Sequence, residues 1–387
     1  MKYAKLVIEN KSRHTDRLYT YRCTDDARIG QVVKLPFSKG NTERRGFVFD
    51  VTNECEIDDS KLKEISSIEE DISLTQEMVE TAVWMRQRYG IRYLDAVNCF
   101  IPRGKAAKNG KQKNPLSNAK GEHQNIDNLT EEQKAACEEI NSAIDSGRQE
   151  NFLIKGVTGS GKTEVYMQAA ARTISKGKTV IMLLPEIALT KQITERFVGR
   201  FGKDSCAILH SHLTGRERFD EWSRVRSGEA KIVIGARMAV FAPLENIGLI
   251  VLDEEHESTY KSDMTPKYET VDIAFKRLMH YSGVLLLGSA TPSVVSYQRA
   301  KEGIYKLIEM NTRYNAVELP DMSIVDMRQE LRKGNRSIFS DKLYQSMDEH
   351  LQNGEQVILF LNRRGYSSSI SCKDCGNTLM CPDCGIS

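Results

Sequence analysis

The residues with the clearest chemical signature are the glycines, lysine and threonine of Gly156–Thr163, GVTGSGKT. Glycines at these positions let consecutive backbone N–H groups curl around an anion, and a helix start adds the positive end of its dipole. Lys162 and Thr163 can then reach the β- and γ-phosphates of a nucleotide and a Mg²⁺ ion. The segment therefore predicts a phosphate-binding loop, and a plain glycine turn between strand and helix is the alternative.

The elements around this loop have the order that such a loop needs. A short apolar strand, Phe152–Ile154, precedes it, and a helical pattern opens at Glu164. Further apolar strands, separated by helical patterns, are expected at residues 178–184, 206–209, 231–235, 249–253 and 284–288. This alternation predicts an α/β fold with a parallel, doubly wound sheet. The loops after Ile154, Leu184, Leu252 and Leu287 should line one cleft, because ligands bind at the carboxyl ends of such strands.

Two acidic residues end the expected strand in Gly248–His256, GLIVLDEEH. Asp253 can hold Mg²⁺ through water, and Glu254 can orient or deprotonate the attacking water. An ordinary acidic loop is the alternative. His256 can connect this site to Gly288–Ser293, GSATPS, which brings small hydroxyl residues to the same cleft; a hydrogen-bonded loop histidine is the simpler interpretation.

Four of the nine cysteines form a cluster near the end of the sequence. Cys372 and Cys375 form one C-x-x-C-G knuckle, and Cys381 and Cys384 form another. The glycine permits the tight turn that brings two thiolates to one metal ion, so the cluster predicts a zinc site, with unligated thiols as the alternative. The remaining cysteines are scattered singly and are expected to be small buried side chains.

The composition describes soluble globular material of more than one domain. The chain has 387 residues, 40% of them hydrophobic and 28% charged. Its formal net charge of +2 does not by itself indicate a nucleic-acid-binding protein, so any DNA contact must come from local patches. No apolar run approaches a membrane span, and MKYAKLVIENK lacks a signal-peptide core. We therefore expect a cytoplasmic protein without a membrane partner.

Four segments follow from the local patterns. Residues 1–104 contain short segments rich in Val, Tyr and Phe and one helix at Met78–Tyr89, which predicts a small β-rich domain. Residues 105–128 form a linker within a stretch, 103–128, that has six Lys or Arg against two acids. Salt-sensitive attraction to a nucleic acid and simple solvation are both open for it. Residues 129–310 form the α/β lobe, and residues 311–387 form a partial second lobe with strands expected at 323–327 and 356–362.

The motifs together resemble superfamily 2 helicases, and specifically the PriA-like primosomal replication-restart helicases. The resemblance is carried by GVTGSGKTEVY, LLPEIALT, LHSHLTGRERFDEW, IVIGARMAVFAP, LIVLDEEHESTYK, LLLGSATPS and LFLNRRGY. It implies a RecA-like P-loop lobe, preceded by a DNA 3′-end-binding domain and followed by a second lobe with a zinc segment. It also implies a bacterial, nucleoid-associated 3′→5′ DNA helicase that needs ATP, Mg²⁺ and Zn²⁺. Forked and single-stranded DNA, primosome proteins and single-strand-binding proteins would be its partners.

The resemblance also assigns roles to individual residues. Those expected at the nucleotide are Gln133, Gly156, Thr158, Gly159, Ser160, Gly161, Lys162, Thr163 and Glu164. Catalysis would use Lys162, Asp253, Glu254 and His256, with Thr163 and Asp253 on Mg²⁺. Ser289 and Thr291 would couple the nucleotide state to DNA. The residues expected at DNA are Lys63, Thr190, Arg237, Tyr260 and Tyr268, although the two tyrosines could instead be packed in a surface loop.

The sequence also departs from the family pattern. Thr20 replaces an acid, and Ser38 replaces a glycine in the domain that grips a DNA 3′ end, so weaker 3′-end selectivity is expected. The sequence has two cysteine pairs where the family has four, and it stops before the last two helicase motifs, so slow ATP hydrolysis is expected. Another superfamily 2 DNA translocase and a nucleotide- and DNA-binding module without motor activity are the alternatives.

Overall fold

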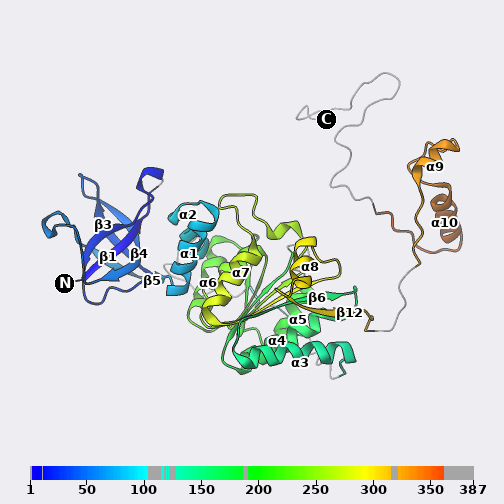
Figure 1. Ribbon diagram of the computed structural model, residues 1–387, viewed down its shortest axis with the longest axis horizontal. Helices are drawn as coiled ribbons and strands as arrows, with labels where there is room; N and C mark the ends of the chain where they lie inside the picture. Colours follow the sequence, from blue (N-terminus) through cyan, green and yellow to red (C-terminus); the bar gives the residue numbers. More distant parts are fainter. Residues whose placement is uncertain are drawn as a thin grey trace, which may run out of the picture. The chain divides into compact units, whose positions relative to one another are not determined.

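The computed structural model describes residues 2–10, 12–102, 115, 116, 119, 121, 128–185, 191–314 and 321–360. Contacts between Cα atoms divide the chain into two compact units, residues 1–318 and 319–387, which are described separately below. Figure 1 shows the order of the elements along the chain. None of the described helices is both long and apolar enough to cross a membrane.

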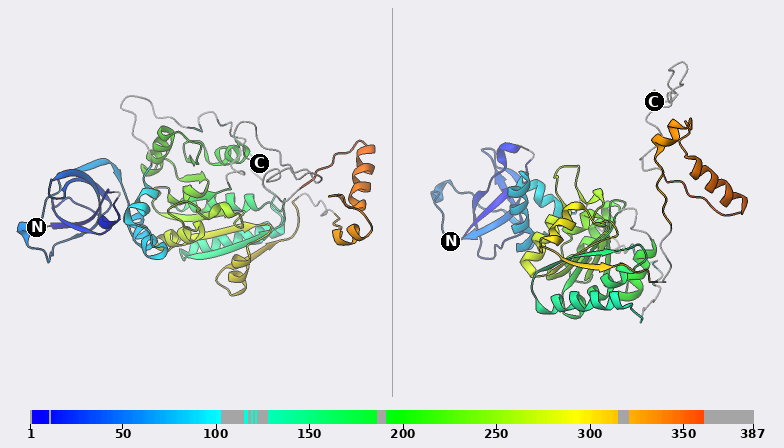
Figure 2. Two further views of the ribbon diagram at one scale, coloured as in Figure 1. Left: turned by 90° about the horizontal axis from the view of Figure 1, so that it is seen from above. Right: turned by 45° about the vertical axis from the view of Figure 1, so that its right-hand side comes forward.

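The first unit begins with an antiparallel sheet, which confirms the expected β-rich start. Its strand order is β2-β1-β4-β3-β5, and Figure 2 shows the strands curling around one another. The strands are β1 (Lys2–Ile8), β2 (Tyr19–Cys23), β3 (Gln31–Phe37), β4 (Thr42–Thr52) and β5 (Ser67–Ser73). Alternating side chains of β1, including Ala4, Leu6 and Ile8, pack with Leu35 and Val48 into its core. Strand β5 was not expected from its acidic sequence, SIEEDIS.

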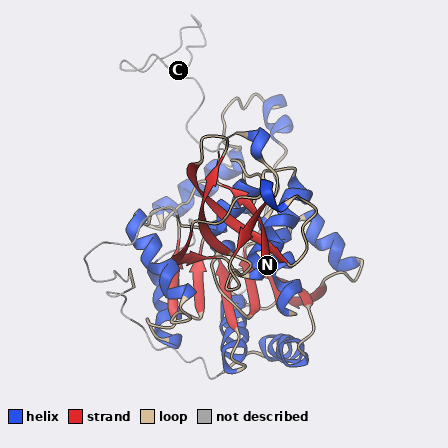
Figure 3. Cartoon of the chain, turned by 90° about the vertical axis from the view of Figure 1, so that its left-hand side faces the viewer, coloured by secondary structure: helices blue, strands red, loops and turns tan. Residues whose placement is uncertain are grey.

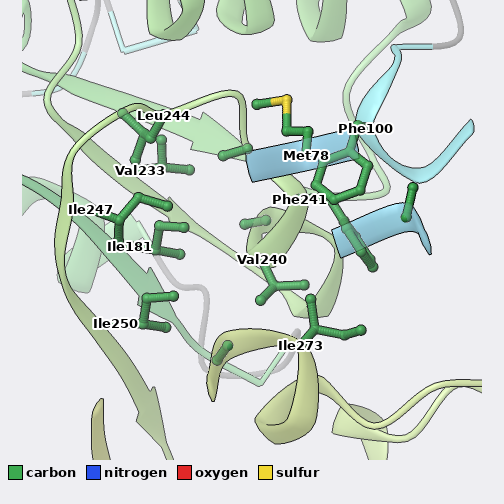
Figure 4. Close-up of a cluster of buried hydrophobic side chains, with 14 of the residues drawn as sticks. Met78, Phe100, Ile181, Val233, Val240, Phe241, Leu244, Ile247, Ile250 and Ile273 are labelled. Carbon is green, nitrogen blue, oxygen red and sulfur yellow. The ribbon is translucent and has the colours of Figure 1, made fainter. Parts of the chain in front are cut away.

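Two helices lead from this sheet to the α/β lobe. Helix α1 (Gln76–Tyr89) begins at Thr75, whose hydroxyl accepts from the N–H of Met78, and ends at the left-handed Gly90. Helix α2 (Tyr93–Phe100) was not expected, because its eight residues are too few for a clear helical period. Figure 4 shows Met78 and Phe100 from these helices in one apolar cluster with Val240, Phe241 and Ile273 of the lobe.

The lobe is built on a seven-stranded parallel sheet with the order β12-β6-β11-β10-β7-β9-β8. The strands are β6 (Glu150–Gly156), β7 (Thr179–Leu183), β8 (Cys206–Leu209), β9 (Ile232–Gly235), β10 (Ile247–Asp253), β11 (Val284–Ser289) and β12 (Lys306–Met310). Six of these strands were predicted, and β12 was not. Figure 3 draws the strands in red, with helices around them.

Helices cover both faces of this sheet, which confirms the doubly wound fold. One apolar cluster contains side chains of α3 (Glu131–Ser146), α4 (Lys162–Ser175) and α5 (Lys191–Phe201). Another contains side chains of α6 (Gly215–Arg226), α7 (Thr270–Tyr281) and the short helix η3 (Arg237–Phe241), with α8 (Val294–Lys301) at its edge. Along β6 to β11, alternate side chains belong to opposite clusters, as a sheet buried on both faces requires, whereas the edge strand β12 contributes Ile308 and Met310 to one cluster.

The second unit differs from the prediction over its described residues. It contains α9 (Met327–Arg332) and α10 (Asp341–Gln352), and residues 323–326 and 356–360 form no strand. Ile324 and Ile358 are 98% and 93% exposed, so these segments bury no apolar side and have no neighbouring strand among the described residues. A single strand is not stable without such a neighbour, and the strand prediction was wrong here.

An ion pair fixes α1 to the lobe. Nε and Nη2 of Arg277 donate to the two carboxylate oxygens of Glu77 over 3.0 and 2.8 Å. Nη1 of Arg277 donates to the carbonyl groups of Val240 and Ala242. Both side chains are fully buried, at 0% and 1% exposure. The desolvated charges are tolerated because nearly every donor and acceptor has a partner.

Removing one partner of this pair should destabilise the protein strongly. We expect Glu77→Ala to lower the free energy of unfolding by about 3–5 kcal/mol, because the Arg277 charge would stay buried and unpaired. The matched control is Arg88→Ala, which removes an exposed pair between α1 and α7, Arg88–Asp272 at 3.2 Å. Arg88 is 57% exposed, so that change should cost less than about 1 kcal/mol. Urea denaturation of both variants measures the difference, and equal losses would contradict it.

The turn between β3 and β4 carries unusual backbone conformations. Ser38 and Asn41 have φ values of 65° and 49°, in the left-handed region that side chains with a Cβ rarely adopt. The Nζ of Lys63 donates to the carbonyl of Ser38 and to Oδ1 of Asn41, which holds the turn in place. The position of Ser38 is therefore one that favours glycine.

Replacing Ser38 by glycine should stabilise the protein. The relief of left-handed strain, offset by the greater freedom of glycine in the unfolded chain, leaves a gain of about 0.5–1 kcal/mol in the free energy of unfolding. Gly90→Ala is the reverse control, because Gly90 ends α1 at a φ of 63°. Thermal unfolding of both variants should show opposite shifts, and a loss of stability in Ser38→Gly would show that the serine makes a compensating contact.

Candidate functional site

The glycine-rich segment forms a tight loop between β6 and α4. Gly159 and Gly161 both have φ of 83°, which only glycine adopts readily. A Cβ at Gly156 would lie 2.7 Å from Oγ of Ser160, so the loop also needs glycine for space. Lys162 is buried and its Nζ donates to the carbonyl of Gly156 over 2.8 Å. The side chain of Lys162 therefore folds back into the loop and reaches the first residue of the loop.

Gln133 braces this loop from α3. Its Nε2 donates to the carbonyl of Ser160 over 3.0 Å, and its Oε1 accepts from the N–H of Thr130 in the capping box that begins α3. A Cβ at Gly161 would approach Nε2 of Gln133 to 2.1 Å. The sequence placed Gln133 near a nucleotide, and the structure places it directly against the loop.

Asp253 ends β10 on the same edge of the sheet. The Tyr166 hydroxyl of α4 donates to Oδ1 of Asp253 over 3.1 Å, and a Cβ at Gly288 would lie 1.6 Å from that hydroxyl oxygen. Only glycine therefore fits at the start of GSATPS. Burial, and next the negative charge of Glu254, raise the pKa of the Asp253 carboxyl. A neighbouring cation would favour its charged form.

Glu254, His256 and Ser289 lie together beside Asp253. Glu254 adopts a φ of 47°, and its carboxylate lies 3.6 Å from Nδ1 of His256. The same Nδ1 lies 2.7 Å from Oγ of Ser289, which also accepts from the N–H of Thr291. A hydrogen bond of His256 therefore connects the acidic loop to the loop after β11.

Glu255, which the sequence analysis did not single out, links the same two loops. Its carboxylate accepts from the N–H of Ser293 over 2.6 Å and from the hydroxyl of Ser296 over 2.9 Å. The N–H of Glu255 donates to the carbonyl of Gly288. The Glu255 side chain is buried and contacts the residues that begin α8. Three consecutive acids thus face three environments, and only the fold distinguishes them.

The residues of the loop fit a nucleoside triphosphate with Mg²⁺. Oγ of Ser160 is buried and has no partner in the part of the chain that the structure describes. Thr163 is half-buried and Thr158 is exposed, so both have surface available. Glu164 differs, because its carboxylate pairs with Arg200 of α5 over 2.6 Å. An unsatisfied hydroxyl beside a lysine and two left-handed glycines is the donor set of a phosphate site.

Arg313 is a further residue at this loop that the sequence did not reveal. A Cβ at Gly159 would lie 3.8 Å from its Cγ, and the next residue, Tyr314, donates its N–H to the carbonyl of Gly159. Nε of Arg313 is buried and meets no hydrogen-bond partner among the described residues. No sequence motif contains Arg313. It lies beside the phosphate loop because β12 pairs with β6, which brings the end of β12 to this loop.

The residues expected at DNA lie in several places. Arg237 donates to the carbonyl groups of Thr259 and Lys261 and lies over the ring of Tyr268. Tyr260 and Tyr268 are both buried, and the Tyr260 hydroxyl donates to the Asp253 carbonyl. The rings are thus packed, as the alternative interpretation had it, and stacking on a base would require the loop to open. Lys63 lies in the segment before β5 and contacts the turn between β3 and β4, and Thr190 lies outside the described residues.

The four clustered cysteines also lie outside the described residues, so the zinc prediction stays a prediction. Among the residues that the structure describes, no group of three or more His, Cys, Asp or Glu side chains could hold a metal ion.

Two known protein families match this chain, one over the first sheet with α1 and α2 and one over the α/β lobe. Residues 6–102 match the 3′ DNA-binding domain (3′BD) of PriA, and residues 130–300 match the DEAD/DEAH box helicase family. The chain is 50% identical to the replication restart protein PriA of Bacillus subtilis over 259 residues, or 67% of this chain. It is 37% identical to that of Rickettsia felis over 92% of this chain, and 33% identical to that of Treponema pallidum over 96%. The chain is a PriA-like protein.

This PriA-like chain spans a third to just over half of the length of these relatives. The matches cover 32% of the Bacillus subtilis protein, 53% of the Rickettsia felis protein and 56% of the Treponema pallidum protein. The matched segments include the first sheet with α1 and α2, and most of the α/β lobe with the loops after β6, β10 and β11.

Arg313 should contribute to nucleotide affinity. We expect Arg313→Ala to weaken the binding of a fluorescent ATP analogue about tenfold or more, because a hydrogen bond to a charged group contributes about 1.5–3 kcal/mol. Arg148→Ala is the matched control, because Arg148 is exposed and precedes β6 at the opposite end of that strand. Equal affinities for the wild type and Arg313→Ala would show that Arg313 only packs against the loop.

Proposed function

We propose that this PriA-like chain is the ATP-binding part of a 3′→5′ DNA helicase that remodels abandoned replication forks and helps to restart replication. The observation that carries the proposal is the joining of three loops at one edge of the sheet. Tyr166 of α4 connects the phosphate loop to Asp253, and Glu255 and His256 connect the acidic loop to the loop after β11. Such joined loops can report the state of a nucleotide to a DNA-binding surface.

In this proposal the amide groups of Gly156–Gly161, Ser160 and Lys162 bind the phosphates of ATP, and Thr163 and Asp253 hold Mg²⁺. The metal ion would neutralise charge that develops on the phosphates. Glu254 is the residue available to orient the attacking water, because its carboxylate is part-exposed beside Asp253. Gln133 holds the loop in shape and would lie near the adenine.

His256 would transmit the nucleotide state. Its Nδ1 faces both Glu254 and Ser289, so a change in the position or charge of Glu254 alters the hydrogen bond to Ser289. Ser289 in turn accepts from the N–H of Thr291. We assign Ser289 and Thr291 the coupling role on this geometry.

DNA would be held by several segments. We propose the division that the sequence suggests: a DNA-binding domain at 1–104, a basic linker at 105–128, a helicase lobe at 129–310 and a partial second lobe at 311–387. Lys63, Thr190 and Arg237 would contact DNA, with Tyr260 and Tyr268 packed behind them.

Forked and single-stranded DNA, primosome proteins and single-strand-binding proteins are the proposed partners, and the bacterial cytoplasm and nucleoid are the proposed location. Cys372, Cys375, Cys381 and Cys384 would hold Zn²⁺.

The phosphate loop and the acidic loop should contribute separately to ATP binding and hydrolysis. Lys162→Ala should abolish nucleotide binding, because Lys162 lies in the phosphate loop, where its Nζ reaches the Gly156 carbonyl. Glu254→Gln should preserve binding and lower DNA-stimulated phosphate release, because an amide cannot take the proton of the attacking water.

Fluorescent-nucleotide titration and phosphate release with saturating single-stranded DNA measure these two properties. Glu257→Gln is the control, because it removes one carboxylate of the same loop. DNA-stimulated phosphate release that Glu254→Gln leaves unchanged would overturn the role of Glu254. Nucleotide binding that survives Lys162→Ala would overturn the assignment of the phosphate loop. Equal responses to forked and duplex DNA would favour another DNA translocase of superfamily 2.

A further inference from the structure

Tyr314 is an exposed tyrosine whose backbone lies against the phosphate loop. Its N–H donates to the Gly159 carbonyl over 2.9 Å, and 50% of its surface is exposed. Among the described residues, its ring joins none of the apolar clusters and packs against no other aromatic ring. A single exposed tyrosine is common on protein surfaces, but this one presents a flat apolar face beside a site for phosphates.

Hydrogen bonds fix the segment that carries this ring. The carbonyl of Met310 accepts from the N–H of Val157 in the phosphate loop. The N–H and the hydroxyl of Thr312 both donate to one carboxylate oxygen of Glu132, over 3.2 and 2.8 Å. Glu132 lies in the first turn of α3. The backbone that leads to Tyr314 is therefore held by the phosphate loop and by the start of α3.

Tyr314 lies on the side of the phosphate loop toward which a base should extend. Strand β6, which leads into the loop, has β11 on one side and β12 on the other. The β11 side leads to the end of β10, where the proposed function assigns Asp253 to Mg²⁺ and Glu254 to the attacking water. Both act at the γ-phosphate, so the base, at the other end of the nucleotide, extends toward the β12 side. That side carries Tyr314.

Arg313 and Tyr314 are consecutive residues with different chemistry. Nε of Arg313 is buried and has no hydrogen-bond partner among the described residues, and its Cγ lies near Gly159. A guanidinium group suits a phosphate, whereas a tyrosine ring suits the face of a base. A nucleoside triphosphate carries both groups, joined by a ribose. The two residues thus match the two ends of one ligand.

We propose that the adenine of ATP stacks on the ring of Tyr314, which makes this tyrosine a binding residue for the base. The inference rests on the proposed function, because it assumes that the phosphate loop binds ATP. The fixed backbone of residues 310–314 would hold the ring in place before the nucleotide arrives, so little conformational freedom is lost on binding. The competing interpretation is that the ring only maintains the shape of the phosphate loop.

The test compares ATP with inorganic tripolyphosphate, which has the phosphates and lacks the base. Both are titrated into the whole chain with Mg²⁺ by isothermal titration calorimetry. Stacking contributes about five- to 100-fold in affinity per base, so Tyr314→Ala should weaken ATP binding about tenfold. The same change should leave tripolyphosphate binding as it is in the wild type. Tyr314→Phe keeps a ring and should preserve the binding of both.

Two further variants are matched controls. Arg313→Ala removes the neighbouring cation and should weaken ATP and tripolyphosphate alike, because it acts on the phosphates. Tyr344→Ala removes a tyrosine of α10 that is 64% exposed and should change neither. Unchanged thermal unfolding midpoints verify that the variants fold.

A fluorescent base reports the stacking directly. The ribonucleoside triphosphate of 2-aminopurine should lose fluorescence when it binds the wild type or Tyr314→Phe, because stacking on a ring quenches this base. It should keep its fluorescence on Tyr314→Ala. Saturating protein removes the contribution of affinity, so this measurement decides even where tripolyphosphate binds too weakly to titrate.

Equal losses of ATP and tripolyphosphate binding in Tyr314→Ala would overturn the base contact and leave the proposed function intact, since the ring would then only shape the loop. Unchanged ATP binding in Tyr314→Ala, or an unquenched base on the wild type, would overturn it as well. A wild-type chain that binds neither ATP nor tripolyphosphate would overturn both the base contact and the proposed function.

Discussion

The buried pair of Glu77 and Arg277 is the interaction on which the first unit most depends. A fully desolvated guanidinium is unfavourable unless every donor has a partner, and Arg277 finds its partners on two elements, the carboxylate of α1 and the carbonyl groups of η3 and the residues after it. The position of η3, which carries Arg237, is therefore tied to the domain in front of the lobe. The rings of Phe100, Phe241 and Tyr268 pack edge to face and also connect this domain to the lobe.

A few buried side-chain contacts also hold the loops at the edge of the parallel sheet. The hydroxyl of Tyr166 occupies the space that a side chain at residue 288 would need, so a helix behind the phosphate loop determines the residue type in another motif. Glu255 then fixes the start of α8 to the acidic loop. These contacts leave Glu254 and His256, at 37% and 32% exposure, as part-exposed chemical groups between buried neighbours.

The sequence predicted those parts whose residues carry a local signal. Apolar runs identified six strands of the parallel sheet, and glycine spacing identified the phosphate loop. Short or polar elements, such as α2 and β5, have no clear period and were missed. Roles that arise only from tertiary contacts were missed as well: the buried partners of Glu255, and the position of Arg313 beside Gly159. The aromatic residues Tyr260 and Tyr268 were recognised, but composition alone could not decide which side of the loop they face.

Strand β12 has a mechanical consequence. It pairs with β6 along its length, the carbonyl of Met310 accepts from the N–H of Val157, and Tyr314 donates to Gly159. The polypeptide therefore passes along the phosphate loop just before it continues toward the second unit. A displacement of the phosphate loop therefore also moves the residues that follow β12, because Val157 and Gly159 are hydrogen-bonded to Met310 and Tyr314. A change at the nucleotide site would thus reach residues 310–314 through the main chain, without any side chain between them.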